Sequence, residues 1–445
     1  DELTGADVRS LGEAMQKGAT TSRAITQRFL TRIAAMDKAG PTVNAVIELN
    51  PDALAIADQR DAERKAGKVR GPLHGIPILI KDNIDSADKM RTSAGSLVLA
   101  ASTPPQDAFI VARLREAGAV LLGKTNLSEW ANYRSTHATS GWSGRGGQTR
   151  NPYVLDRNPG GSSAGTGAAI AAAFATVGIG TETDGSIINP SSLNGLVGLK
   201  PTVGLWSRSG IIPISASQDT AGPMGRTVSD VAILLGALTG TDPRDAATAA
   251  SAGHTAADYT KFLAMDGLKG ARIGVARNLG GFNPEVDRLV DAAVAALKAA
   301  GATVVDPANL PTANQYGDAE TTVLDYEFKD GLAKYFATLG PKAPVKSLAD
   351  LIAWNEKERA REMPFFAQEI FDRAVKCGPL TDAKYRDARA KCLKMTRTDG
   401  LDAVMTRQRL DAIISPSNPP AWGTDHLNGD HYTGGDTSFA AVAGY

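Results

Sequence analysis

The sequence has 445 residues, and its 48 Lys and Arg residues balance 48 Asp and Glu residues. A zero net charge provides no strong field to attract nucleic acid or an anionic membrane surface, and it favours a small or neutral ligand. The longest apolar stretch, residues 168–180, falls short of the ~20 residues that a membrane span needs. We therefore expect neither a nucleic-acid-binding nor a membrane-spanning protein.

The first half of the chain alternates between helix and strand patterns. Asn50 is predicted to be the N-cap and Pro51 the first residue of a helix that ends near Gly67. The next expected elements are a buried strand at 76–81, an amphipathic helix at 107–118, an apolar strand at 119–123 and a buried Ala-rich helix at 167–175.

The same alternation returns in the second half, with a strand at 271–276, a helix at 284–300 and a strand at 303–306. Residues 342–409 are predicted to form charged helices that cover a surface. Alternating strands and helices are typical of a layered α/β fold. Because no stretch has the composition of a linker, we expect one domain over residues 1–445.

Residues 140–215 are rich in Gly, Ser, Thr and Asn, which suits a region where the backbone approaches a substrate closely. This region contains Ser162 and Ser163 in one cluster and Ser186 in another. Lys81, at the end of the apolar strand, adds a base. A nucleophile, a bridging hydroxyl and a base are therefore all present without a histidine.

Further motifs accompany these segments in a fixed order. They are Gly71–Pro77, Leu121–Glu129, Leu196–Thr202 and Ser217–Met224. Together with the three catalytic segments, they resemble the amidase signature family, serine hydrolases that use a Ser-Ser-Lys triad. The resemblance implies a three-layer α/β/α fold around a large twisted mixed β-sheet. Family members continue past the segment at 440–445, so the resemblance also implies that the usual C-terminal strands and helix are missing.

The resemblance implies a role for each residue of the trio. Ser186 would attack the amide, and Ser162 would relay the proton to Lys81 after a cis peptide bond. The oxyanion hole would consist of the backbone N–H groups of Thr183, Asp184, Gly185 and Ser186. Ser163, Thr181 and Gly161 would support this geometry.

Lys81 can act as a base only if it is uncharged. A free lysine has a pKa of ~10.4, but burial disfavours its charged form and lowers the pKa by several units. The apolar residues 76–80 would provide this environment, and Asp82 would point to the opposite face of the strand.

The resemblance is strongest to bacterial peptide amidases, through Ser128–Arg134 and Gly146–Pro152. Many family members have two glycines before the nucleophile and an arginine two residues after it, whereas this chain has Asp184-Gly185 and Ile188. This difference concerns specificity rather than catalysis. The candidate substrate contacts are Trp130, Asn132, Tyr133, Arg134, Gln218 and Asp219. Packing roles are equally open for Trp130, Tyr133 and Arg134.

We therefore predict an amidohydrolase of peptide or amino-acid amides that needs neither a cofactor nor a metal. The same chemistry would serve aryl amides, esters or carbamates. A glutaminase component of a transamidating complex is a further alternative. The sequence leaves open whether the protein is a monomer or a homodimer, and whether it is cytoplasmic or exported after cleavage of a signal.

Three other patterns carry less weight. Residues 161–165 also fit a nucleophile elbow centred on Ser163, which would need a partner such as His254, His426 or His431. Residues 118–125 match a phosphate-binding loop in letters, but their apolar centre predicts a strand. The spacing of His426 and His431 is not a metal-ligand pattern. Finally, Cys377 and Cys392 could pair, although we favour free thiols.

Overall fold

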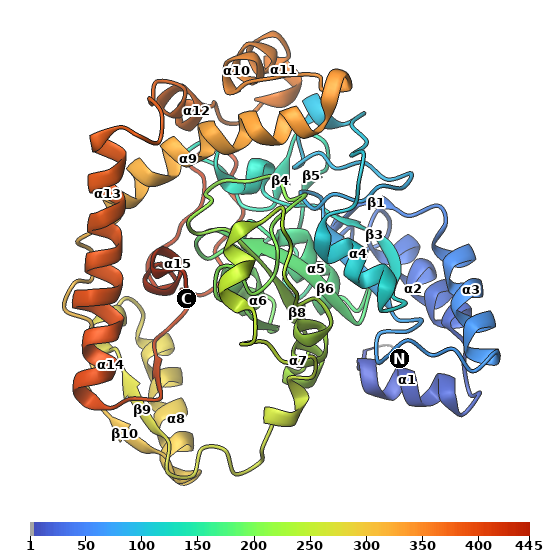
Figure 1. The fold of residues 1–445 in the computed structure, drawn as a ribbon, viewed down its shortest axis with the longest axis horizontal. Coiled ribbons are helices and arrows are strands. Elements are labelled where there is room, and N and C mark those ends of the chain that lie inside the picture. Colours follow the sequence, from blue (N-terminus) through green and yellow to red (C-terminus); the bar gives the residue numbers. More distant parts are fainter. Residues whose placement is uncertain (1–3) are drawn as a thin grey trace.

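The computed structural model describes residues 4–445. A mixed six-stranded sheet lies at its centre, with strand order β1-β3-β2-β6-β8-β7 (Figure 1). β3, β2 and β6 run parallel, whereas β1, β8 and β7 pair antiparallel with their neighbours. The strands are β1 (Val46–Leu49), β2 (Pro77–Lys81), β3 (Val120–Thr125), β6 (Val177–Glu182), β7 (Val197–Gly198) and β8 (Thr220–Gly225).

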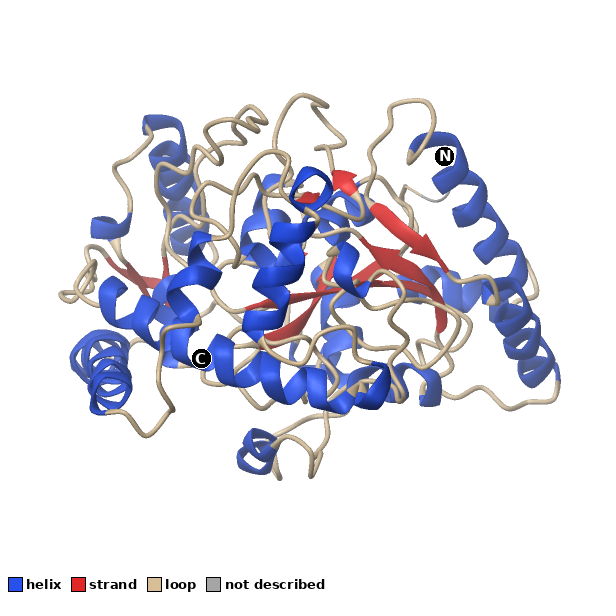
Figure 2. Ribbon diagram, turned by 90° about the horizontal axis from the view of Figure 1, so that it is seen from above, coloured by secondary structure: helices blue, strands red, loops and turns tan. Residues whose placement is uncertain are grey.

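A second, parallel sheet of three strands has the order β10-β9-β11. Figures 1 and 2 place it to one side of the main sheet, opposite the N-terminal helices. Its strands are β9 (Arg272–Val275), β10 (Thr303–Val305) and β11 (Ala412–Ile414), and a short hairpin contains β4 (Trp142–Ser143) and β5 (Gly147–Gln148).

Helices surround both sheets. Those of the first half are α1 (Val8–Gln16), α2 (Ser22–Met36), α3 (Ala53–Lys65), α4 (Phe109–Glu116), α5 (Ala164–Ala171), α6 (Ile188–Leu193) and α7 (Val228–Ala237). Those of the second half are α8 (Pro284–Ala299), α9 (Gly317–Thr338), α10 (Leu348–Lys357), α11 (Arg359–Glu362), α12 (Glu369–Ala374), α13 (Ala383–Leu393), α14 (Asp402–Gln408) and α15 (Ser438–Ala443). Within residues 4–445, no helix is both long and apolar enough to cross a bilayer.

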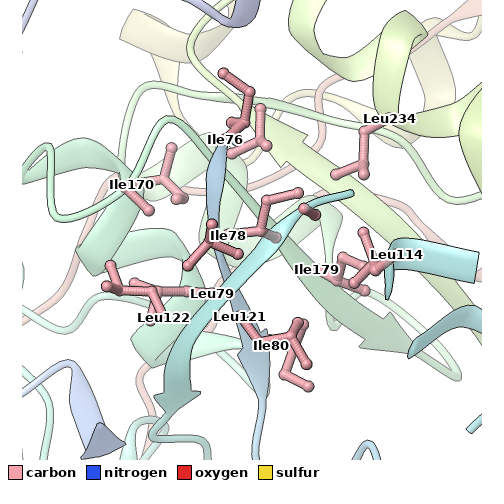
Figure 3. Close-up of a cluster of buried hydrophobic side chains, with 14 of the residues drawn as sticks. Ile76, Ile78, Leu79, Ile80, Leu114, Leu121, Leu122, Ile170, Ile179 and Leu234 are labelled. Atoms are coloured by element: carbon pink, nitrogen blue, oxygen red, sulfur yellow. The ribbon is translucent and has the colours of Figure 1, made fainter. Parts of the chain in front are cut away.

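The main sheet is buried on both faces. Figure 3 shows Ile170 of α5 beside Leu79 and Leu122, while Leu114 of α4 and Leu234 of α7 lie on the other side, toward Ile179. Alternate residues of each strand point to opposite faces, so both sets of side chains contribute to the core. The predicted layered α/β fold with a mixed sheet is confirmed.

Most predicted elements lie within two residues of the observed ones. The start of α3 is an exception, because Asp52, rather than Asn50, is its N-cap. The Asn50 side chain instead donates to the Leu121 carbonyl (2.8 Å) and accepts from the Asp52 amide (3.0 Å). It therefore attaches the loop to β3 and displaces the helix start. The expectation of free thiols is confirmed for both cysteines.

Candidate active site

The candidate site lies where two parallel strands end beside the start of a helix. Lys81 is the last residue of β2, Thr181 is next to last in β6, and Ser163 directly precedes α5. Ligand sites in α/β proteins occur at this carboxyl edge of the sheet. Three distant parts of the sequence meet here because β2 and β6 are neighbours in the sheet.

The Lys81 amine is fully buried among uncharged oxygen atoms. Its Nζ lies 2.8 Å from Ser162 Oγ, 3.0 Å from Ser163 Oγ, 2.9 Å from Thr181 Oγ1 and 3.2 Å from the Thr181 carbonyl. Burial lowers the pKa of Lys81 to about 7, although Glu182 and Asp219 partly oppose this effect. A large fraction of the amine is therefore neutral at neutral pH. Asp82, as predicted, points away, since its carboxylate accepts from Ser93.

Ser162 follows a cis peptide bond from Gly161. Its carbonyl accepts a hydrogen bond from the Ser128 amide (3.0 Å), and the Gly161 amide donates to Asn189 Oδ1 (3.0 Å). A Cβ atom on Gly161 would lie 2.3 Å from Ser128 Oγ, so any larger residue would displace this segment. The Ser163 hydroxyl is also fixed, because it donates to the Thr181 carbonyl (3.1 Å) and accepts from the Thr181 amide (3.2 Å).

Ser186 joins the cluster through its carbonyl, which accepts from the Ser163 amide (3.1 Å). Ser186 keeps 8% of its surface exposed, whereas Ser162 and Ser163 keep none. Ser186 is therefore the hydroxyl of the three that a substrate can reach.

The segment before Ser186 is a turn with free amides. In the part of the chain that the structure describes, the backbone N–H groups of residues 183–186 donate to no protein acceptor. The buried Glu182 carboxylate fixes the end of the turn by accepting from the amides of Ile187 (2.7 Å) and Ile188 (2.9 Å). Gly185 has φ +81°, a conformation that glycine adopts readily. The predicted oxyanion-hole residues thus present unpaired donors.

A cavity of about 540 Å³ opens at this turn and is lined by Gly161, Asp184 and Gly185. Asp430, also in the lining, accepts from the Ser140 amide (2.9 Å) and from Trp422 Nε1 (3.1 Å), and burial raises its pKa. Among the described residues, no Lys, Arg or His lines this cavity. It therefore offers polar and acidic groups to a ligand.

Of the four candidate contacts at residues 130–134, Asn132 lines the cavity. Trp130 is buried and packs against aromatic rings, and the buried Arg134 pairs with Glu129 (3.1 Å). The Tyr133 hydroxyl donates to Asp325 (2.8 Å). Their positions indicate packing roles for Trp130, Tyr133 and Arg134.

The other two candidates, Gln218 and Asp219, support the turn instead. Asp219 accepts from Thr183 Oγ1 (2.5 Å) and from the amides of Ile214 and Ser215 (both 2.9 Å), and burial raises its pKa to about 6. Asp219 also lines a separate cavity of about 270 Å³ on the far side of the turn.

Several residues of the site were not singled out from the sequence. Asn83 donates to Thr181 Oγ1 (3.0 Å), and Thr437 and Ser438 donate to the Asp184 carboxylate. Asn83 stands in the same motif as Lys81 and could have been found by its position. Thr437 and Ser438 follow Asp184 by some 250 residues and carry no local pattern.

The alternative patterns do not fit the structure. His426 contacts Gln148 (2.9 Å) rather than Ser163, so it does not complete a nucleophile elbow. Lys124 is fully buried inside β3, where it cannot reach a phosphate. Within residues 4–445, no group of three or more His, Cys, Asp or Glu side chains is arranged to hold a metal ion.

Comparison with known proteins agrees with this geometry. The amidase family profile matches residues 24–441. The chain belongs to the amidase signature family. Two similar crystal structures are native peptide amidase from Stenotrophomonas maltophilia (TM-score 0.95) and a peptide amidase in complex with the competitive inhibitor chymostatin (TM-score 0.96). Each is 50% identical to this chain, and the match covers 99% of this chain and 89% of the other.

A second group of relatives has a different printed role. One of the subunits of the glutamyl-tRNA(Gln) amidotransferase from Alkalilimnicola ehrlichii is 37% identical over 418 residues, which cover 93% of this chain and 82% of that protein. The chain is therefore an amidase-family hydrolase with relatives in two functional groups.

Proposed function

We propose that this amidase hydrolyses the terminal carboxamide of peptides or amino-acid amides through an acyl-enzyme on Ser186. In this mechanism, Ser186 Oγ attacks the carbonyl carbon while its proton passes through the Ser162 hydroxyl to Lys81. The protonated amine returns the proton to the leaving nitrogen, which departs as ammonia. Water then repeats the sequence and releases the acid.

The observation that carries this proposal is the environment of Lys81. An ammonium group has three N–H donors, but four oxygen atoms lie within 3.2 Å of Nζ. A neutral amine has two donors and one lone pair, and the lone pair can accept the proton of one hydroxyl. Ser162 Oγ, at 2.8 Å, is the nearest of the four oxygens. Nucleophilic catalysis by serine requires such a neighbouring base.

The free amides of residues 183–186 support the other half of the mechanism. Negative charge develops on the carbonyl oxygen when Ser186 attacks, and preorganised N–H groups stabilise it. Removing one such donor lowers the rate by roughly 100-fold or more in serine hydrolases. Ser186 follows these amides directly, so the attacking oxygen and the donors belong to one turn.

The cavity supports a neutral or donor-rich substrate. The free amino acid glutamine carries an α-carboxylate, and the cavity lining offers it no cation among the residues that the structure describes. Ile188 also stands where many family members have an arginine. A peptide amide carries no carboxylate at its reacting end, so it meets no repulsion from Asp184 or Asp430. The similarity to two peptide amidases supports the same substrate class.

The test is a panel of peptide amides, anilides, esters, carbamates and free glutamine, with ammonia or amine release as the readout. We expect peptide amides to give the highest kcat/KM. Ser186→Ala should lower kcat by about 10⁴-fold or more with an unchanged melting temperature. Ser192→Ala, at an exposed serine of α6, is the matched control and should keep full activity. More than a few per cent of the activity in Ser186→Ala, or faster hydrolysis of glutamine than of peptide amides, would overturn the proposal.

A further inference from the structure

The turn that precedes Ser186 is tied to the rest of the molecule by its first two residues. The Thr183 carbonyl accepts from Gln218 Nε2 (3.4 Å), and the Asp184 carboxylate accepts from Thr437 Oγ1 (2.6 Å) and from the Ser438 hydroxyl. These attachments come from two separate loops. The position of the free amides therefore depends on how the two loops are joined.

One side chain of α9 joins them. Glu320 Oε1 accepts from Gln218 Nε2 (3.0 Å), and the Glu320 carboxyl also hydrogen-bonds the Asp184 carboxylate. Gln218 is fully buried and uses the same Nε2 for Glu320 and for Thr183. Glu320 is thus connected to both attachments of the turn.

Two carboxylates cannot hydrogen-bond each other unless one of them carries a proton. Here Glu320 is the natural donor, because Asp184 already receives two hydroxyl hydrogen bonds that favour its ionised form. The surroundings agree: burial, Asp184 and Asp436 raise the pKa of Glu320 well above its ordinary value, whereas the Gln218 hydrogen bond opposes this. The other titratable neighbours are Tyr316, on the preceding turn, and Cys392, on α13 beside Arg389.

We propose that Glu320, in its protonated form, is a positioning residue that holds the Thr183–Ser186 turn where its amides can bind the oxyanion. This inference rests on the proposed function, since it assumes that these amides stabilise the transition state. Ionisation of Glu320 would place a second negative charge beside Asp184 and break their hydrogen bond. Both effects oppose the negative charge that develops on the substrate oxygen, so kcat should fall on the alkaline side of the optimum.

Glu320→Gln tests the inference because it mimics the protonated acid. Its Nε2 can donate to Asp184 and its Oε1 can accept from Gln218, but it cannot ionise. We expect Glu320→Gln to retain kcat at neutral pH and to lose the alkaline decline of the wild-type enzyme. Glu320→Ala removes both bonds and should lower kcat by about 10- to 100-fold with KM changed less than about threefold. Asp318→Asn, an exposed carboxyl on the same helix, is the matched control and should leave the whole pH profile unchanged.

The inference is overturned if Glu320→Gln shows the same alkaline decline as the wild type, or if a folded Glu320→Ala keeps the wild-type kcat. If Glu320→Ala does not fold, the pH profile of Glu320→Gln alone decides. The acid limb, which we assign to Lys81, should persist in every Glu320 variant and serves as an internal reference. Failure of the proposed function would appear separately, as activity that survives Ser186→Ala.

Discussion

Two buried lysines occupy adjacent strands of the main sheet, and their surroundings differ. In the register of β2 and β3, Lys124 pairs with Ile80 and Lys81 pairs with Thr125, so the two lysines point to opposite faces. Both are fully buried, and burial lowers the pKa of each. The difference lies in their partners.

Lys124 has carboxylates nearby, whereas Lys81 touches only neutral groups. Lys124 donates to the Ile84 carbonyl and to Thr92 Oγ1 (2.9 Å), and Asp82 and Asp85 favour its charged form. Burial raises the pKa of Asp85 to about 7, which shows how dry this face is. The comparison teaches that burial alone does not make a catalytic lysine; hydroxyl partners, one of them leading to a nucleophile, make the neutral amine useful.

The largest effect should come from removing the amine on the active-site face. Lys81→Met keeps the apolar stem but removes the base and the proton donor for the leaving nitrogen. We expect kcat for a peptide amide to fall by about 10⁴-fold, since both acid and base catalysis are lost. Steady-state ammonia release, with circular dichroism as the folding control, measures this. Activity within about tenfold of the wild type would show that the two lysines do not differ as described.

The same substitution on the other face should affect stability instead. Lys124→Met leaves Asp82 and Asp85 without a buried cation beside them, and breaking such a pair costs about 3–5 kcal/mol. Activity per folded molecule should stay within about threefold, because Lys124 contacts no residue of the proposed triad. Urea unfolding followed by fluorescence, combined with active-site titration, checks both outcomes. A stable but inactive Lys124→Met would contradict the comparison.

The smallest effect sharpens the comparison through pH. Lys81 has a pKa of about 7 in the folded protein, against ~10.4 when unfolded. Between these values the unfolded chain binds more protons, so this group makes the protein more stable as pH rises and less stable as pH falls toward 7. From pH 7.5 to 8.5 the wild type should gain about 1 kcal/mol more than Lys81→Met does. Equal gains, measured by denaturant unfolding at the two pH values, would mean that Lys81 is charged when buried.

The sequence predicted the parts of this protein that depend on local pattern. Apolar runs located β2 and β3, and the motifs around Lys81, Ser162 and Ser186 located the candidate triad. The helix start at Asn50 was misplaced because its side chain bonds to β3, a tertiary contact without a local signal. Glu320, Thr437 and Ser438 were missed for the same reason, since they reach the oxyanion turn only after the chain has folded.

Trp130 and Arg134 illustrate a second limit. Their types and their place in a motif suit either packing or substrate binding, and burial distinguishes the two uses. In the structure both are almost fully buried, and Arg134 stacks over Phe366 at 4.3 Å. Exposure is a property of the assembled fold, so the sequence left these roles open.

The central claim is that a neutral Lys81 activates Ser186, and covalent modification by phenylmethylsulfonyl fluoride tests it without a choice of substrate. Intact-mass and peptide-mapping spectrometry would follow the sulfonyl adduct as a function of pH. The account predicts one adduct, on Ser186, with a rate that rises through an apparent pKa near 7 in the wild type, and no measurable adduct in Lys81→Met. An adduct on Ser162 or Ser163, or an unchanged rate in Lys81→Met, would contradict it.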